Sequence, residues 1–219
     1  MKLFIYEHCP YCIRPRVVLG YKGIECDIEY LLDNDIAGHM EKIGAKQVPI
    51  LQKEDNSYMT ESLDIIEYLD NLNGNPIFLK TNGRNDIKQI FSDRSTEYRT
   101  LIFSYVQSAS LGEFTTDEAR QHFIKRYLKH INLDNVSEAI ELREKHKEKV
   151  ENTLKKLEKC IYSKKHISAC GLSMDDIIYF ANLQRMLIVP DLYIPLRLSE
   201  YMEYQLSQNN CNINYIELI

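Results

Sequence analysis

Cys9 and Cys12 stand two residues apart near the start of the chain, within the segment CPYC. A Cys-x-x-Cys pair can bind a metal ion, form a structural disulfide or act as a redox couple. Which of these it does depends on the elements that position it. The apolar run at residues 3–6 predicts a buried strand, and residues 11–21 predict a helix. The pair is therefore expected where a strand passes into a helix.

The ligand count argues against a metal site. Zinc and iron-sulfur sites need about four ligands, and only Cys9, Cys12 and His8 are local, with no second Cys-x-x-Cys in the chain. We expect no metal. The other cysteines show no paired spacing and are expected to be small core or boundary residues; they are Cys26, Cys160, Cys170 and Cys211.

Cellular location bears on the disulfide reading. The N-terminus lacks a signal-peptide core, and no window approaches the roughly eighteen apolar residues of a spanning helix. We therefore expect a cytoplasmic protein that does not enter a membrane. A purely structural disulfide is disfavoured in that reducing compartment.

The redox reading has a physical mechanism. At the start of a helix, the Cys9 sulfur would lie near free backbone N–H groups and the positive end of the helix dipole, which stabilise a thiolate. Cys9 is then the attacking nucleophile. Cys12, one turn inside the helix, would be more enclosed and would resolve a mixed disulfide. Pro10 stiffens the first turn and the Tyr11 ring can flank the thiol, while the neighbouring His8 could tune its pKa.

Composition excludes some other classes of function. The chain has 219 residues, 44% of them hydrophobic, which is enough to bury a full-sized core. The formal net charge is −5, whereas a general nucleic-acid binder needs a basic surface. We expect no nucleic-acid partner.

The hydrophobic pattern divides the chain into two parts. Residues 1–72 predict the order β-α-β-α-β-β-α with parallel and antiparallel pairing, hence a mixed four-stranded sheet. Residues 73–84, rich in Asn and Gly, predict a linker, and residues 85–219 predict an all-helical domain. After the first strand and helix, the expected strands are 24–32, 47–52 and 58–59, and the expected helices are 35–43, 61–72, 87–110, 117–130, 136–161, 174–189 and 195–208.

These motifs resemble known families. CPYC directly after a first strand resembles the glutaredoxins, whose fold is thioredoxin-like. A helical domain after such a domain resembles the glutathione S-transferases. The combination resembles the bacterial glutaredoxin 2 type, which joins the two. The resemblance rests on MKLFIYEHCPYC and KQVPILQKEDNSYMTES, and beyond about residue 70 it is chiefly architectural.

The resemblance implies how glutathione would be bound. Val48–Pro49 resembles the Val-cis-Pro step whose valine backbone pairs with the cysteinyl part of glutathione. Glu61–Ser62 resembles the acidic-Ser pair that holds the γ-glutamyl end, and a helix start with a hydroxyl suits a carboxylate. Lys46 is a weaker candidate for the glycine carboxylate, with Arg16 as the alternative. Pro10 and Tyr11 complete the expected glutathione site beside Cys9 and Cys12.

A second resemblance concerns folding. Ser173, followed three residues later by Asp176, resembles the N-capping box of the transferase helical domain. We expect this motif to stabilise the start of a helix and to take no part in catalysis.

The expected function is a glutathione-dependent thiol–disulfide oxidoreductase that reduces protein disulfides and glutathione mixed disulfides in cell redox homeostasis. Glutathione is the expected co-substrate, the protein partners are disulfide-bearing or glutathionylated proteins, and a monomer is expected. One alternative is a glutathione S-transferase that conjugates electrophiles, although such an enzyme does not need Cys12. Another is a non-catalytic partner-binding module with the transferase fold.

Overall fold

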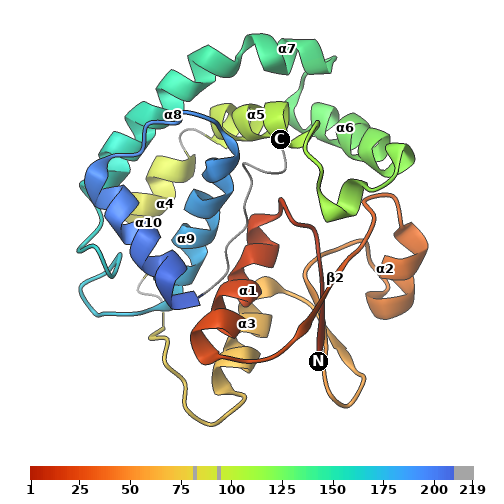
Figure 1. Cartoon of the computed structure of the whole chain (residues 1–219), viewed down its shortest axis with the longest axis vertical. Coiled ribbons are helices and arrows are strands. Elements are labelled where there is room, and N and C mark those ends of the chain that lie inside the picture. The colour runs from red at the N-terminus through yellow and green to blue at the C-terminus, as the bar shows by residue number, and fades with distance from the viewer. Residues whose placement is uncertain (81–82, 93–94, 210–219) are drawn as a thin grey trace. The chain divides into compact units, whose positions relative to one another are not determined.

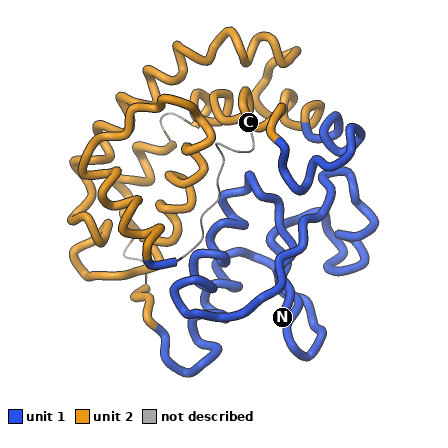
Figure 2. Tube along the Cα trace, viewed as in Figure 1, with its two compact units in different colours: residues 1–76, 110–123, 208–213 blue, residues 77–109, 124–207, 214–219 orange. Residues whose placement is uncertain are grey.

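The computed structural model describes residues 1–80, 83–92 and 95–209. Cys211 and residues 81–82 of the predicted linker lie outside this part. The chain forms two compact units (Figure 2). Unit 1 comprises residues 1–76, 110–123 and 208–213, and unit 2 comprises residues 77–109, 124–207 and 214–219. The predicted boundaries at residues 72 and 85 stay a prediction.

Unit 1 contains the predicted four-stranded mixed sheet. The strand order is β2-β1-β3-β4, in which β1 pairs parallel with β2 and antiparallel with β3. This arrangement confirms the thioredoxin-like part of the predicted fold. Its elements are β1 (Lys2–Ile5), α1 (Pro10–Lys22), β2 (Asp27–Tyr30), α2 (Ile36–Ile43), β3 (Ile50–Gln52), β4 (Tyr58–Met59) and α3 (Ser62–Asn71).

Both faces of the sheet are covered by helices, α1 and α3 on one side and α2 on the other (Figure 1). Side chains alternate along β1, so Leu3 and Ile5 are buried on one face. On the opposite face Phe4 clusters with Tyr6 and Ile50. This burial fixes β1 in the middle of the sheet, and the loop that follows it carries Cys9.

Two strands are shorter than predicted. β2 has four residues, and Ile28 on it is 39% exposed, because β2 is an edge strand. β3 begins only at Ile50, because Pro49 has no N–H to contribute to a strand ladder. Segment 47–49 is thereby left as a loop beside the sheet.

Unit 2 is helical, as predicted. The predicted helix 136–161 divides at Leu142, whose ψ of −6° departs from the helical value of about −42°. The predicted helix 87–110 is represented by two helices, and α5 ends before residue 107. The helices are α4 (Asn85–Ser92), α5 (Ser95–Val106), α6 (Asp117–Ile131), α7 (Val136–Glu141), α8 (Arg143–Glu158), α9 (Met174–Arg185) and α10 (Leu196–Asn209), with the short 3-10 turn η2 (Met186–Ile188). α6 begins in unit 1, α10 ends there, and the 3-10 turn η1 (Gly112–Phe114) belongs to unit 1.

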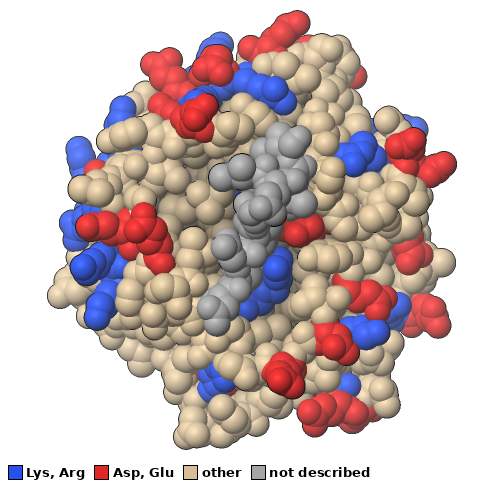
Figure 3. Space-filling view, in the orientation of Figure 1, with Lys and Arg blue, Asp and Glu red and all other residues tan. Residues whose placement is uncertain are grey.

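The face of the molecule that Figure 3 shows has no strong bias of charge. Acidic and basic side chains are interspersed on the face seen in Figure 3. No described helix is both long and apolar enough to cross a membrane. The expectation that the cysteines other than Cys9 and Cys12 are core or boundary residues is wrong for Cys170, which is exposed in a turn before Gly171, itself at φ 100°.

The predicted capping box is present at the start of α9. The Asp176 carboxylate accepts the Ser173 N–H at 2.9 Å, and the two residues form the reciprocal box. We expect Ser173→Ala to lower the free energy of unfolding by about 1 kcal/mol, the usual value of an N-cap. Urea denaturation measures this, with Ser163→Ala, in the loop before α9, as the comparison. An unchanged midpoint in Ser173→Ala would contradict the prediction.

Candidate active site

Cys9 is the N-cap residue of α1, and Pro10 occupies the first helical position. The Cys9 carbonyl accepts the N–H groups of Cys12 and Ile13 at 3.0 and 3.2 Å, so the first turn closes on it. The predicted start of the helix is confirmed to within one residue. Cys9 is partly exposed at the helix N-terminus, where backbone dipoles stabilise a negative charge.

Cys12 lies one turn further and only 1% of it is exposed. The Tyr6 N–H donates to its Sγ at 3.5 Å. Burial raises the pKa of the Cys12 thiol well above its ordinary value, and the hydrogen bond and charge of Cys9 raise it further. The two cysteines therefore differ in access, because Cys9 is partly exposed and Cys12 is enclosed.

Cys12 is expected to react with iodoacetamide at least about tenfold more slowly than Cys170 near neutral pH, because its thiolate is rare and its sulfur is enclosed. Cys170, in an exposed turn, serves as the internal control. Peptide mapping by mass spectrometry over a time course gives both rates. Equal rates for Cys12 and Cys170 would contradict the assignment.

Arg14 of α1, two residues after Cys12, contacts the first residue of α3. The Arg14 Nη1 donates to the Ser62 Oγ at 3.1 Å, and the Arg14 guanidinium lies 4.6 Å from the Tyr11 ring centroid. Ser62 is buried, whereas Tyr11 is 53% exposed. The structure thus brings two predicted glutathione contacts, Tyr11 and Ser62, into contact with one arginine.

The loop before β3 meets the residue before α3. The peptide bond Val48–Pro49 is cis, as the resemblance implies. The side-chain amide of Gln47 donates to the Glu61 carboxylate at 2.7 Å. Glu61 has φ 67°, a left-handed conformation that is uncommon outside glycine and occurs often at binding sites. The structure therefore joins segment 47–49 to the predicted Glu61–Ser62 pair.

The candidates for the glycine carboxylate already interact with acidic groups. The Lys46 Nζ lies 3.5 Å from Oδ2 of the fully buried Asp33, which also lies 2.7 Å from His122 Nδ1. Arg16 acts on Glu7, where its charge opposes the effect of burial, which raises the pKa of that carboxyl. Lys46 stands two residues before Val48, so it remains the better placed in sequence.

Sequence reasoning missed Glu113. This fully buried carboxylate lies 2.5 Å from Nδ1 of His8, the residue before Cys9, although it is 105 residues away in the chain. The His8 ring packs on aromatic neighbours, with centroids 5.8 Å from Phe114 and 5.0 Å from Phe123. No local pattern in the segment LGEF marks Glu113 as a functional residue.

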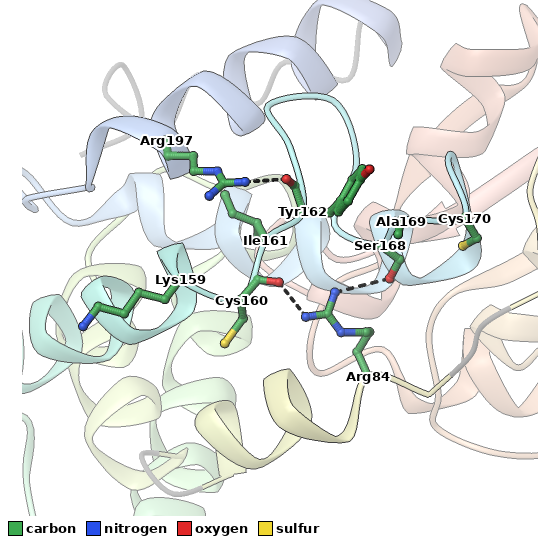
Figure 4. Close-up of a pocket in the computed structure, with 9 residues that line it drawn as sticks. All are labelled: Arg84, Lys159, Cys160, Ile161, Tyr162, Ser168, Ala169, Cys170 and Arg197. Carbon is green, nitrogen blue, oxygen red and sulfur yellow. Dashed lines mark hydrogen bonds between the residues drawn. The ribbon is translucent and has the colours of Figure 1, made fainter.

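Unit 2 contains a pocket of about 560 Å³. Arg84 donates to both carboxylate oxygens of Asp86, at 2.9 and 2.7 Å, and to the Cys160 carbonyl at 2.5 Å, while Arg197 donates to the Tyr162 carbonyl. These arginines tie loops together, and no predicted site residue lines the pocket. The lining residues are Arg84, Lys159, Cys160, Ile161, Tyr162, Ser168, Ala169, Cys170 and Arg197 (Figure 4).

Metal ligands are not grouped in the part of the chain that the structure describes. Over residues 1–80, 83–92 and 95–209, no three His, Cys, Asp or Glu side chains are arranged to hold a metal ion. The chemistry available at the N-terminus of α1 is that of the two thiols.

Comparisons with known proteins agree with this geometry. Residues 86–213 match the family model "Glutaredoxin 2, C terminal domain", and residues 3–76 match "Glutathione S-transferase, N-terminal domain". Glutaredoxin 2 of Escherichia coli K12 is 31% identical over 97% of each chain. A crystal structure of glutaredoxin 2 from Salmonella typhimurium in complex with glutathione is 29% identical, with a TM-score of 0.92 and coverage of 100% of this chain and 98% of that one.

A more distant structure supports the fold alone. The beta class glutathione S-transferase of Sphingomonas chungbukensis is 20% identical, with a TM-score of 0.53 over 96% of this chain and 95% of that one. The match to glutaredoxin 2, at 31% identity over nearly the full length of both chains, shows the family as well as the fold. The chain therefore belongs to the glutaredoxin 2 family.

Proposed function

We propose that the protein reduces glutathione mixed disulfides and protein disulfides through Cys9 and Cys12, with glutathione as the reductant. Membership of the family makes it a glutaredoxin. The observation that carries the proposal is the asymmetry of the pair: Cys9 caps α1 and is partly exposed, whereas Cys12 is buried one turn inside. The Salmonella relative, whose structure contains glutathione, supports the choice of reductant.

In the first step, the Cys9 thiolate attacks the sulfur of a glutathione mixed disulfide. A Cys9–glutathione disulfide forms, the substrate S–S bond breaks, and the protein thiolate leaves with the electron pair and takes up a proton. A second glutathione thiolate can then attack the glutathione sulfur. This releases glutathione disulfide and restores the Cys9 thiolate.

Cys12 offers the second route. Its thiolate attacks the Cys9 sulfur, forms the Cys9–Cys12 disulfide and releases glutathione, and two further glutathione molecules then return the enzyme to the dithiol. The charge and hydrogen bond of Cys9 are among the causes that raise the pKa of Cys12. Both are lost once Cys9 is in a mixed disulfide, so Cys12 becomes more acidic at the stage when it has to attack.

Glutathione would lie across the N-termini of α1 and α3. The Ser62 hydroxyl and the free N–H groups at the start of α3 suit the γ-glutamyl carboxylate, and Glu61 suits the ammonium group. The Val48 backbone, next to Pro49, would pair with the cysteinyl part. Pro10 and Tyr11 would flank the reacting sulfurs, and Lys46 would attract the glycine carboxylate.

Ser62→Ala is expected to raise KM for glutathione about tenfold, the effect of one lost hydrogen bond to a charged group. Alkylation of Cys9 should proceed at the wild-type rate, because the hydroxyl bonds Arg14 and not the cysteine pair. Ser57→Ala, in an exposed turn where the hydroxyl bonds Asp55, is the matched control. A wild-type KM for glutathione in Ser62→Ala would show that Ser62 does not bind glutathione.

The proposed function is tested by glutathione-coupled reduction of a small mixed disulfide, run beside conjugation of glutathione to an aryl halide. We expect turnover in the first assay and background rates in the second. The reverse result would identify a transferase and overturn the proposal. Background rates in both would favour a non-catalytic module and would overturn it as well.

A further inference from the structure

The buried carboxylate of Glu113 holds the backbone immediately before Cys9. Its Oε2 accepts the Glu7 N–H at 2.9 Å, and its Oε1 accepts the His8 N–H at 3.3 Å. The same Oε1 lies 2.5 Å from His8 Nδ1. A buried carboxylate is stable only when its oxygens are hydrogen-bonded, so these contacts fix both partners in place.

The segment that carries Glu113 is itself held to the active-site loop. The Gly112 N–H donates to a carboxylate oxygen of Glu7 at 3.3 Å, so Glu7 and the segment exchange hydrogen bonds. The Asp33 N–H donates to the Glu113 carbonyl at 3.2 Å. A Cβ on Gly112 would stand 2.3 Å from the Tyr30 ring, so only glycine allows this approach. The carboxylate is thus built into unit 1.

The negative charge of Glu113 acts on the cysteine pair. Burial alone would raise its pKa, but the hydrogen bond and charge of His8 outweigh burial and lower it, which keeps the group ionised. Its charge also adds to the effect of burial in raising the pKa values of Cys12 and Glu7. A buried anion is weakly screened and disfavours a thiolate nearby.

We propose that Glu113 is a positioning residue of the redox centre, whose contacts to Glu7 and His8 hold Cys9 at the helix N-terminus and whose charge makes the dithiol a stronger reductant. This deepens the proposed function and rests on it. In the exchange concerned, two reductant thiols give up two electrons and form a disulfide, the Cys9–Cys12 bond breaks, and both enzyme sulfurs are reduced. A neighbouring negative charge destabilises the thiolate side of this equilibrium.

The test measures the equilibrium constant of the Cys9–Cys12 disulfide with dithiothreitol and, separately, with glutathione, at one fixed pH for all variants. Glu113→Gln keeps the size and removes the charge, and is expected to shift the constant at least about threefold toward the enzyme dithiol. Glu113→Asp keeps the charge and is expected to stay within about twofold of wild type. Thermal unfolding of each variant monitors the fold.

Two outcomes would overturn the inference: a wild-type constant in folded Glu113→Gln, or an equal shift in Glu113→Asp. If Glu113→Gln does not fold, His8→Gln decides, because it removes the imidazole and leaves the carboxylate. That variant is expected to shift the constant toward the disulfide, and a shift toward the dithiol would contradict the role of the charge. If the wild-type protein exchanges with dithiothreitol but not with glutathione, the proposed function is overturned. The equilibrium constants with dithiothreitol would still test the role of Glu113.

Discussion

Replacing Cys9 with Ser is expected to reduce glutathione-coupled turnover of a mixed disulfide by at least about a thousandfold, to the background rate. The reason is chemical: a serine hydroxyl does not form the sulfur–sulfur bond of the intermediate, and Cys12 cannot substitute for Cys9. Cys12 is 1% exposed and burial raises the pKa of its thiol. Steady-state rates at saturating glutathione measure the effect.

Cys12→Ser is expected to separate the two routes of resolution. Turnover of a glutathione mixed disulfide should persist, because a second glutathione can attack the intermediate from solution. Reduction of a protein disulfide should fall much further, because the Cys9–protein intermediate then has no internal thiol to resolve it. Equal losses on both substrates would contradict the resolving role.

Cys170→Ser supplies the matched control for both variants. Cys170 is an exposed thiol in unit 2 and has no role in the proposed mechanism. Wild-type rates are expected for it on both substrates. If activity survives in Cys9→Ser while Cys170→Ser equals wild type, another residue is the nucleophile and the mechanism is refuted.

The positions of Cys9 and Cys12 could be predicted because their causes are local. A buried strand, a tight connection and a proline at the first helical position lie within about fifteen residues, and each leaves a clear mark on the sequence. The structure confirms Cys9 as the N-cap and Cys12 as the enclosed partner. The order of strands and helices along residues 1–72 could be predicted from the same kind of local hydrophobic pattern.

The long-range contacts could not be predicted in the same way. Glu113 meets His8 across 105 residues, and Arg14 meets Ser62 across 48. Neither contact produces a periodic pattern, because each depends on one side chain and on the topology that brings it close. Lys46 shows the same limit: its type suited a carboxylate, but its contact with the buried Asp33 required the folded chain.

Asp176→Ala is expected to cause the largest loss of stability, on the order of 4 kcal/mol in the free energy of unfolding. One oxygen of the carboxylate accepts the Ile167 N–H at 2.8 Å and the Tyr201 hydroxyl at 3.1 Å. The other accepts the N–H and the hydroxyl of Ser173 at 2.9 and 3.2 Å. Removing the carboxylate leaves the buried N–H groups of Ile167 and Ser173 without this acceptor, while the Tyr201 hydroxyl keeps only its hydrogen bond to the Asp176 carbonyl, at 3.3 Å.

Asp176→Asn distinguishes lost acceptors from lost volume. Both oxygens of a carboxylate accept hydrogen bonds, whereas an amide has one oxygen and one NH2 group. In Asp176→Asn the NH2 group would therefore face one of the two pairs of donors and could not accept their hydrogen bonds. Burial raises the pKa of Asp176, so the charge itself is costly, and a stable Asn variant would show that charge relief outweighs the lost acceptor. We expect the reverse, with Asn at least half as destabilising as Ala in urea denaturation. The control is Asp64→Asn, at an exposed first-turn residue of α3, which should change the free energy of unfolding by less than about 1 kcal/mol.

The comparison with Ser173→Ala separates the capping box from the other hydrogen bonds of the Asp176 carboxylate. Both variants lose the capping box, but only the Asp176 variants also lose the carboxylate hydrogen bonds to Ile167 and Tyr201. The larger loss of stability in the Asp176 variants therefore measures how strongly the loop before α9 is held to α10.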